Sequence, residues 1–239
     1  MRGIHMDKMK NGAVLRNGTQ RTAKEVFEKY AIVIAFLALL LVVSILCSSF
    51  LTPSNLILVL NQTSINGILA VGITYVLITA GIDISIGSVV GLSGVISAMV
   101  VKAGAPLPVG FLCGILAGTL VGVIIGILVT KGKLAPYIVT LGFLTIIRGA
   151  ALLIAGGRPI SSLGDAYGWI GNHNVFGVIP CPVIIFLIVV VIGHIILAHL
   201  QIGRYIYAVG GNSNAAEACG ISPNKVKMFV HVFCGTCAG

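Results

Sequence analysis

The sequence predicts an all-α polytopic membrane protein with six complete transmembrane helices and the start of a seventh. Three observations lead to this fold class. Of the 239 residues, 57% are hydrophobic and only 9% are charged, whereas about 25% of the residues in a soluble domain are charged. Long apolar stretches recur along the chain, each long enough to cross a hydrocarbon core of ~30 Å as a helix. Lys and Arg are distributed unequally between the connections, which indicates how the chain is oriented.

The predicted spans follow one another with short connections. They lie at residues 30–50, 57–80, 84–101, 107–129, 134–155 and 182–200. A seventh apolar run opens near Met228 and reaches Gly239 after 12 residues, which is too short to cross a bilayer. We therefore expect the sequence to stop inside a helix and to lack a C-terminal part.

Basic residues predict a cytoplasmic N-terminus. Residues 1–29 form a basic tail, and residues 30–239 form the predicted membrane domain. If the tail is inside, the inside segments (1–29, 81–83, 130–133 and 201–227) carry 12 Lys and Arg, and the outside segments carry only Lys102 and Arg158. Because cytoplasmic loops are enriched in Lys and Arg, this bias favours that orientation. The net charge of +9 is then typical of membrane retention rather than of nucleic-acid binding.

Two connections are long enough to have structure of their own. The outside connection, 156–181, contains Tyr167, Trp169 and Phe176 and predicts an ordered loop with an aromatic belt. The inside connection, 201–227, contains a Gly-Gly-Asn turn, the helix-permissive run AAEA, Gly220, and then Ser222-Pro223 as the N-cap and first position of a helix. We expect two short helices joined by a turn on the cytoplasmic face.

Glycine recurs every fourth residue in the fourth span and predicts a helix-packing ridge. Small residues at this spacing let two membrane helices approach closely. Ser85, Gly87, Ser88, Gly91 and Gly94 predict a similar packing face on the third span. The ridge of the fourth span consists of Gly110, Gly114, Gly118, Gly122 and Gly126.

Asp83 and Arg148 are the ionisable residues that stand in or beside apolar sequence. A carboxylate in a membrane segment suggests a proton or ion site. Alternatively, Gly81 breaks the chain and Asp83 or Ser85 caps the third helix at the cytoplasmic edge, and we favour this interpretation. Arg148, well inside the fifth span, either extends toward the outer interface or faces a polar path.

Polar side chains crowd the outer half of the second span, at Asn61, Gln62, Thr63, Ser64 and Asn66. A helix that faces lipid would not carry five such groups, so they should face other helices or a water-accessible route. Uncharged amides and hydroxyls suit a neutral polyhydroxylated solute, and interhelical hydrogen bonding explains them equally well. Phosphate-loop, metalloprotease and nucleophile-elbow motifs are absent from the sequence, so we predict that the chain is not an enzyme and holds no metal.

Four blocks of the sequence resemble the membrane permease subunits of bacterial ATP-binding cassette importers for sugars. They are residues 61–94, 140–149, 203–228 and 232–239. The resemblance implies that 201–227 is the cytoplasmic loop that couples the permease to an ATP-hydrolysing subunit. The residues that match the family's pattern there are Gly210, Gly211, Asn212, Ala215, Ala216, Glu217, Gly220 and Ile221.

The resemblance also implies the surroundings of the protein. They are a bacterial cytoplasmic (inner) membrane, a second permease copy or paralogue, a cytoplasmic ATP-binding cassette subunit that binds the ATP, and a periplasmic or surface sugar-binding protein. The permease itself would hold no cofactor and bind no nucleic acid. The leading hypothesis is ATP-driven transport of a monosaccharide such as ribose. The alternatives are an ion-coupled secondary transporter that uses Asp83 and a truncated fragment without function.

Overall fold

The computed structural model describes residues 30–161, 163, 167–168, 171, 174–175 and 179–239. The predicted tail 1–29 and the aromatic residues Trp169 and Phe176 lie outside these residues. The chain divides into two compact units, one ending at Leu56 and one beginning at Ile57. In the first unit, the apolar helix Tyr30–Leu46 is followed by a turn in which the Asn55 side-chain amide donates to the Phe50 carbonyl at 2.7 Å.

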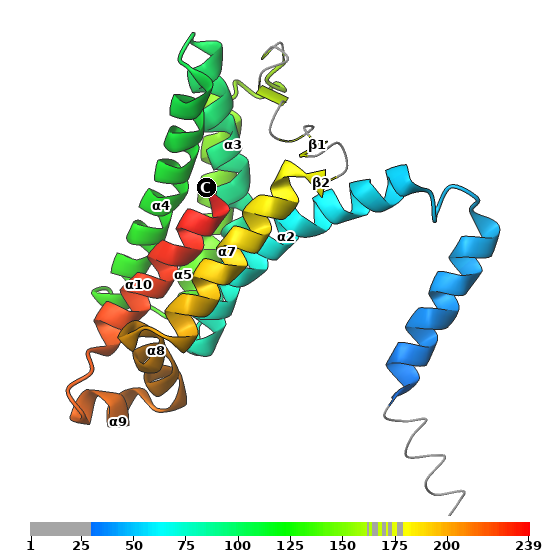
Figure 1. Cartoon of the computed structure of the whole chain (residues 1–239). Coiled ribbons are helices and arrows are strands. Elements are labelled where there is room, and N and C mark those ends of the chain that lie inside the picture. Colours follow the sequence, from blue (N-terminus) through cyan, green and yellow to red (C-terminus); the bar gives the residue numbers. More distant parts are fainter. Residues whose placement is uncertain (1–29, 162, 164–166, 169–170, 172–173, 176–178) are drawn as a thin grey trace, which may run out of the picture. The chain divides into compact units, whose positions relative to one another are not determined.

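Helices dominate the described chain, as the sequence predicts (Figure 1). A helix covers most of each predicted span, and four helices, α2, α4, α5 and α7, are long and apolar enough to cross a membrane. The helix Tyr30–Leu46 and α3 are also apolar but shorter. One pair of two-residue antiparallel strands, β1 and β2, precedes α7. The elements after the first helix are α2 (Pro53–Ile78), α3 (Ile86–Lys102), α4 (Leu107–Thr130), α5 (Pro136–Ile154), β1 (Asn174–Val175), β2 (Ile179–Pro180), α7 (Cys181–Ala198), α8 (Gln201–Gly211), α9 (Ser213–Ala218) and α10 (Pro223–Ala238).

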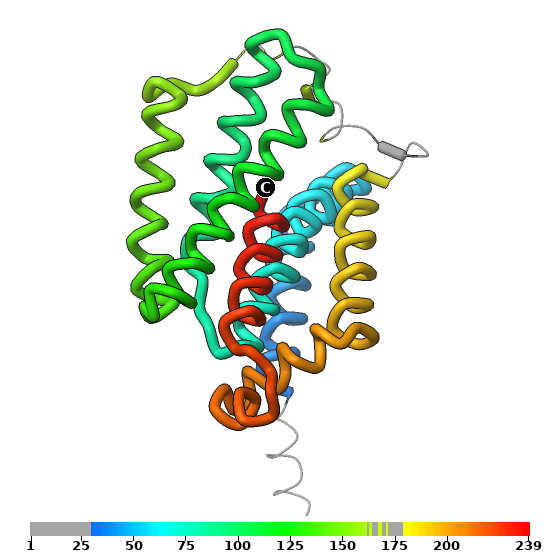
Figure 2. The backbone as a smooth tube through the Cα atoms, turned by 90° about the vertical axis from the view of Figure 1, so that its left-hand side faces the viewer, coloured from blue at the N-terminus to red at the C-terminus, as the bar shows by residue number. Residues whose placement is uncertain are grey.

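The helices of the second unit pack as a series of neighbours: α5 on α3, α3 on α4 and α4 on α10 (Figure 2). On its other side α10 contacts α2, where the rings of Tyr75 and Phe233 lie 4.4 Å apart. Beyond α2 lies α7, and the Tyr75 hydroxyl donates to the Gly193 carbonyl of α7 at 2.6 Å. The buried core follows these contacts and includes Tyr75, Ile125 and Val230.

A non-helical segment of residues 79–85 connects α2 to α3 (Figure 2). It begins as a Schellman motif, because Gly81 N–H donates to the Val76 carbonyl at 3.0 Å and Ala80 N–H to that of Leu77 at 2.9 Å. The left-handed position of this motif is normally glycine. Here it is Ala80, with φ 57°. The helix-ending residue predicted from sequence, Gly81, is therefore one position too late.

Residues 201–239 form three helices in place of the predicted two short helices and partial span. α8 begins directly after α7 and covers Gln201–Gly211, whereas the sequence predicts no helix there. α9 contains the run AAEA, as predicted. Ser222 and Pro223 begin a helix at the predicted position, but that helix is not a separate short one. It continues through the run that the sequence places from Met228 onward, so both belong to α10.

Candidate functional site

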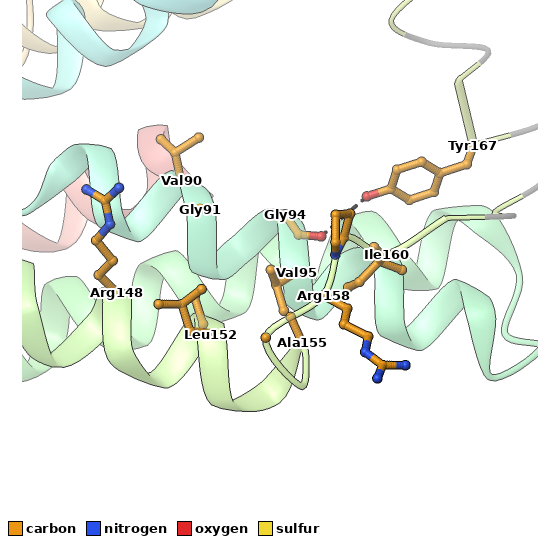
Figure 3. Close-up of a pocket in the computed structure, with 14 residues that line it drawn as sticks. Val90, Gly91, Gly94, Val95, Arg148, Leu152, Ala155, Arg158, Ile160 and Tyr167 are labelled. Atoms are coloured by element: carbon orange, nitrogen blue, oxygen red, sulfur yellow. Dashed lines mark hydrogen bonds between the residues drawn. The ribbon is translucent and has the colours of Figure 1, made fainter.

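Two adjoining cavities lie between α3 and α5, and Figure 3 shows residues that line the larger one. The larger, about 650 Å³, is lined by apolar and small residues of both helices, together with Arg158 and Tyr167 from the chain after α5. The smaller, about 450 Å³, extends toward the start of α3. Gly91, Arg148 and Ala151 line both cavities. We call the two cavities together the α3–α5 groove.

Arg148 stands where the two cavities meet. It is the thirteenth residue of α5, and its side chain is exposed at one end of the larger cavity (Figure 3). The only side-chain carboxylates in the described part of the chain belong to Asp83 and Glu217, and neither forms an ion pair with Arg148. Arg148 is thus a cation without a carboxylate partner among the described residues, and it lines both cavities.

The glycines of α3 line this groove rather than pack against a helix. A Cβ added to Gly87, Gly91 or Gly94 would meet no atom within 4 Å. The expectation of a packing face at these residues is therefore wrong within the described chain. Their spacing brings them to one face of the helix, and sequence alone does not distinguish a small-residue face that packs from one that lines a cavity.

Hydrogen bonds to backbone carbonyls fix the walls of the groove. The Ser88 hydroxyl, which lines the smaller cavity, donates to the Leu144 carbonyl of α5 at 2.9 Å. At the other end, the Tyr167 hydroxyl lies 3.5 Å from the Gly94 carbonyl, and its ring stacks on Phe111 with centroids 6.0 Å apart. Tyr167 is the described member of the predicted aromatic belt, and it lines the larger cavity.

Asp83 is held by the residues around the start of α3. Its Oδ1 accepts the backbone N–H of Ser85 at 2.9 Å and the Ser85 hydroxyl at 2.7 Å. The Ser85 side chain itself makes no capping bond to α3, so of the two residues predicted as caps only Asp83 binds a backbone N–H at this helix start.

The contact of Asp83 with α10 gives its position relative to the helices. The Cys234 thiol of α10 lies 4.0 Å from Asp83 Oδ2. Cys234 is 11 residues beyond Pro223, the first residue of α10, which is ~16 Å along a helix axis. The segment after α2 thus returns between the helices, and Asp83 lies among them rather than at the level where α10 begins.

The polar cluster of α2 does not reach the α3–α5 groove. Asn61 donates to the Gly171 carbonyl at 3.2 Å, and the buried Ser64 hydroxyl donates to the Leu60 carbonyl of its own helix at 2.7 Å. Gln62, Thr63 and Asn66 are exposed. These residues line neither cavity, so the structure does not bring them together with Arg148.

The glycine ridge of α4 lies in close contact with α3 and α10. A Cβ on Gly110 or Gly114 would meet Ser97 or Ser93 of α3. A Cβ on Gly118 would collide with the Gly235 carbonyl of α10, and one on Gly122 with the His231 carbonyl. Gly126 faces the Met228 side chain, 2.7 Å from an added Cβ. All five positions lack the room for a side chain without movement of a neighbour.

The predicted coupling residues surround α9. The Asn212 side chain caps α9 by accepting the N–H groups of Asn214 and Ala215, both at 3.0 Å. Gly211, Asn212, Ala215, Glu217 and Gly220 are exposed and form a surface of mostly small side chains, which we call the α9 surface. Ala216 is buried and Ile221 half-buried. Gly210 is turned inward, since a Cβ there would collide with the Ile78 carbonyl of α2.

Comparisons with known proteins identify relatives of the chain. Residues 55–239 match the family model described as branched-chain amino acid transport system / permease component. The ribose import permease protein RbsC of Escherichia coli (strain K12) is 38% identical over 209 residues, 86% of this chain and 65% of that protein. The protein of the same name from Bacillus subtilis (strain 168) is 40% identical over 211 residues, 88% of this chain and 66% of that protein.

Another relative is named for a different sugar: the D-allose transport system permease protein AlsC of Escherichia coli (strain K12). It is 34% identical over 191 residues, 80% of this chain and 58% of that protein. The chain therefore spans less than two thirds of the length of these relatives. No solved structure matches the chain. The family resemblance seen in the sequence is confirmed: the chain is a multi-pass membrane protein that belongs to the family of branched-chain amino acid transport system / permease components.

Proposed function

We propose that this protein is the permease component of an ATP-driven importer of a monosaccharide, and that the α3–α5 groove is part of the path of the sugar. The main observation in support of this path is the position of Arg148. It lines both cavities where they meet, and it has no carboxylate partner among the described residues. Sugar hydroxyls accept hydrogen bonds from such a guanidinium. Relatives are named for ribose and D-allose, and we propose ribose or a similar pentose or hexose as the substrate.

The walls of the groove beside Arg148 carry small side chains or none. Gly87, Gly91 and Gly94 leave the α3 wall without side chains, and the facing wall carries Ala151. The guanidinium carries only N–H donors, so it favours occupants that supply oxygen atoms as acceptors. Because the walls are small and apolar and only one residue is a strong hydrogen-bond donor, a sugar would bind here weakly and transiently rather than tightly.

Uptake of radiolabelled ribose by the full-length protein with its partner subunits tests the path. Arg148→Gln should reduce uptake at least tenfold, and Arg148→Lys should restore part of it because a cation returns without the planar fork. Lys102→Gln is the matched control, because it removes a basic residue that lines neither cavity. If Arg148→Gln transports at the wild-type rate while folding normally, the α3–α5 groove is not the path.

We further propose that the α9 surface binds the ATP-hydrolysing subunit in the cytoplasmic membrane of a bacterium. Its exposed small side chains let a partner approach the backbone closely, and the Asn212 cap keeps α9 folded. Ala215→Arg should reduce co-purification of the ATPase subunit. Gln201→Arg, at the exposed first residue of α8, adds the same charge away from α9 and should leave co-purification intact. Equal recovery of the ATPase with both variants would contradict this assignment.

A further inference from the structure

The segment 79–85 has contacts at one end with α8 and lines the smaller cavity of the α3–α5 groove at the other. It follows α2 and precedes α3 (Figure 2). Neighbours on three other helices, α5, α8 and α10, contact it or the residue just before it, and each contact is made to a backbone or carboxylate oxygen. An irregular backbone among membrane helices must have its polar groups satisfied by neighbours, so these contacts determine where the segment lies.

The contact with α8 is between two backbones. Gly210 approaches the carbonyl of Ile78, the last residue of α2, so closely that an added Cβ would collide with it. The same Cβ would lie 3.6 Å from Thr79 Cα. Neither backbone can yield as a flexible side chain would. A displacement of α8 is therefore transmitted directly to the end of α2 and to Thr79.

The contacts with α5 and α10 hold the middle of the segment. The fully buried Thr140 hydroxyl of α5 lies 3.2 Å from the Ile82 carbonyl and 3.3 Å from the Tyr137 carbonyl of its own helix, and it shares its proton between them. Within the segment, Asp83 Oδ1 accepts the Ser85 N–H at 2.9 Å and its hydroxyl at 2.7 Å, and Oδ2 faces the Cys234 thiol of α10 at 4.0 Å. The Ser85 carbonyl in turn accepts the N–H groups of Ser88 and Val89 at 2.8 and 3.1 Å, so the segment and the start of α3 move together.

The far end of the segment forms part of the groove. Ile84 lines the smaller cavity, next to Gly87 and Ser88. Ser88 is tied to the Leu144 carbonyl of the opposite wall at 2.9 Å. A shift of Ile84 relative to α5 therefore changes the width of the cavity that contains Arg148. The chain of contacts from α8 to this cavity is continuous in the described residues.

We propose that residues 79–85 are the link through which movement of the cytoplasmic loop changes the width of the α3–α5 groove, with Gly210 and Asp83 as its positioning residues. This inference rests on the proposed function, because it presumes that the α9 surface receives the movement of an ATPase subunit. It assigns to Gly210 an inward role in place of direct contact with that subunit. It also assigns to Asp83 a mechanical role that requires no change of protonation.

The test is the number of sugar molecules transported per ATP hydrolysed by the complete transporter in proteoliposomes. Gly210→Ala should separate the two activities: uptake should fall at least tenfold, while ATP hydrolysis and co-purification of the ATPase subunit are kept. Gly142→Ala is the matched control, since a Cβ at this membrane-helix glycine meets nothing within 4 Å and the residue lines neither cavity. It should leave the ratio unchanged.

A pair of variants at Asp83 keeps the inference testable if Gly210→Ala does not fold. Asp83→Ala removes the acceptor for Ser85 and should lower the transport ratio at least fivefold. Asp83→Asn keeps a side-chain oxygen that can accept the Ser85 N–H and should restore most of it. An ion-coupled carrier that used Asp83 would instead lose transport with asparagine.

Several outcomes would overturn the inference. One is a wild-type ratio in Gly210→Ala or in Asp83→Ala. Another is a parallel loss of uptake and ATP hydrolysis in both Gly210→Ala and Asp83→Ala, because neither substitution would then separate transport from hydrolysis. If the wild-type protein imports sugar, either of these variant results leaves the proposed function standing. Absence of ATP-driven sugar uptake by the wild-type protein would overturn the proposed function and this inference with it.

Discussion

Replacement of Gly118 by alanine should destabilise the contact between α4 and α10. The added Cβ would collide with the Gly235 carbonyl and lie only 2.7 Å from Gly239 Cα, whereas ordinary contacts begin at 3.4 Å. The helices would have to separate by roughly 0.5–1 Å, and forcing an extra carbon into a packed contact costs ~1–3 kcal/mol. Thr119 and Thr236, whose hydroxyls lie 3.0 Å apart across the same contact, would lose part of their hydrogen bond, ~0.6 kcal/mol.

Thermal unfolding in detergent, followed with a thiol-reactive dye, measures this loss. Cys234 is buried in α10, so it becomes reactive when α10 separates from its neighbours. At about 2–4 °C per kcal/mol for a chain of this size, Gly118→Ala should lower the midpoint by roughly 3–10 °C. Gly149→Ala is the control, because its Cβ meets nothing within 4 Å and alanine favours the helix by up to ~1 kcal/mol. Equal midpoints for the two variants would refute the reasoning.

Three further substitutions test individual contacts. Tyr75→Phe removes the hydroxyl that donates to the Gly193 carbonyl at 2.6 Å and should lower the free energy of unfolding by ~0.5–1.5 kcal/mol; an unchanged midpoint in the same dye assay would contradict this. Asn212→Ala removes the acceptor of two N–H groups at the start of α9, a loss of ~1 kcal/mol, so the Ala215 amide should exchange with deuterium about fivefold faster, and equal exchange would count against the cap. Ala80→Gly relieves the φ of 57° and should stabilise the protein by ~0.5–1 kcal/mol, unless a lower midpoint shows that the alanine methyl group has a packing role.

The helices could be predicted from the sequence because lipid imposes a simple requirement on an apolar chain. A span must satisfy its own backbone hydrogen bonds, so its length and composition are visible without knowledge of its neighbours. The first residue of α10 was also visible, since Ser222-Pro223 is a local helix-start signal. α8 was missed because its stability depends on packing: Gly203, Ile206 and Val209 are buried, and no local signal marks its beginning.

The candidate site could be predicted only in part. Arg148 stood out because a cation within an apolar span is rare. The residues around Arg148 could not be predicted, because Gly91 and Ala151 have no functional side-chain group and belong to helices far apart in the sequence. The same limit explains Gly210, whose neighbour Ile78 lies 132 positions earlier. Asp83 was expected to cap the first turn of the third helix, and it accepts instead the N–H of Ser85, one residue before α3. Its contact with Cys234 joins residues far apart in the sequence, and only the folded chain shows it.

The order of synthesis gives the contact between α4 and α10 a further consequence. Thr119 and Thr236 are 117 residues apart, and ribosomes add ~5–20 residues per second. The part of the α4 ridge that contacts α10 (Gly118, Gly122 and Gly126) is therefore synthesised roughly 6–20 s before the α10 residues that cover it. During that interval lipid or an insertion chaperone must cover this part of the ridge. Biogenesis of this protein thus includes a stage in which α4 is already in the membrane while the helix that will cover its glycine ridge has not yet been synthesised.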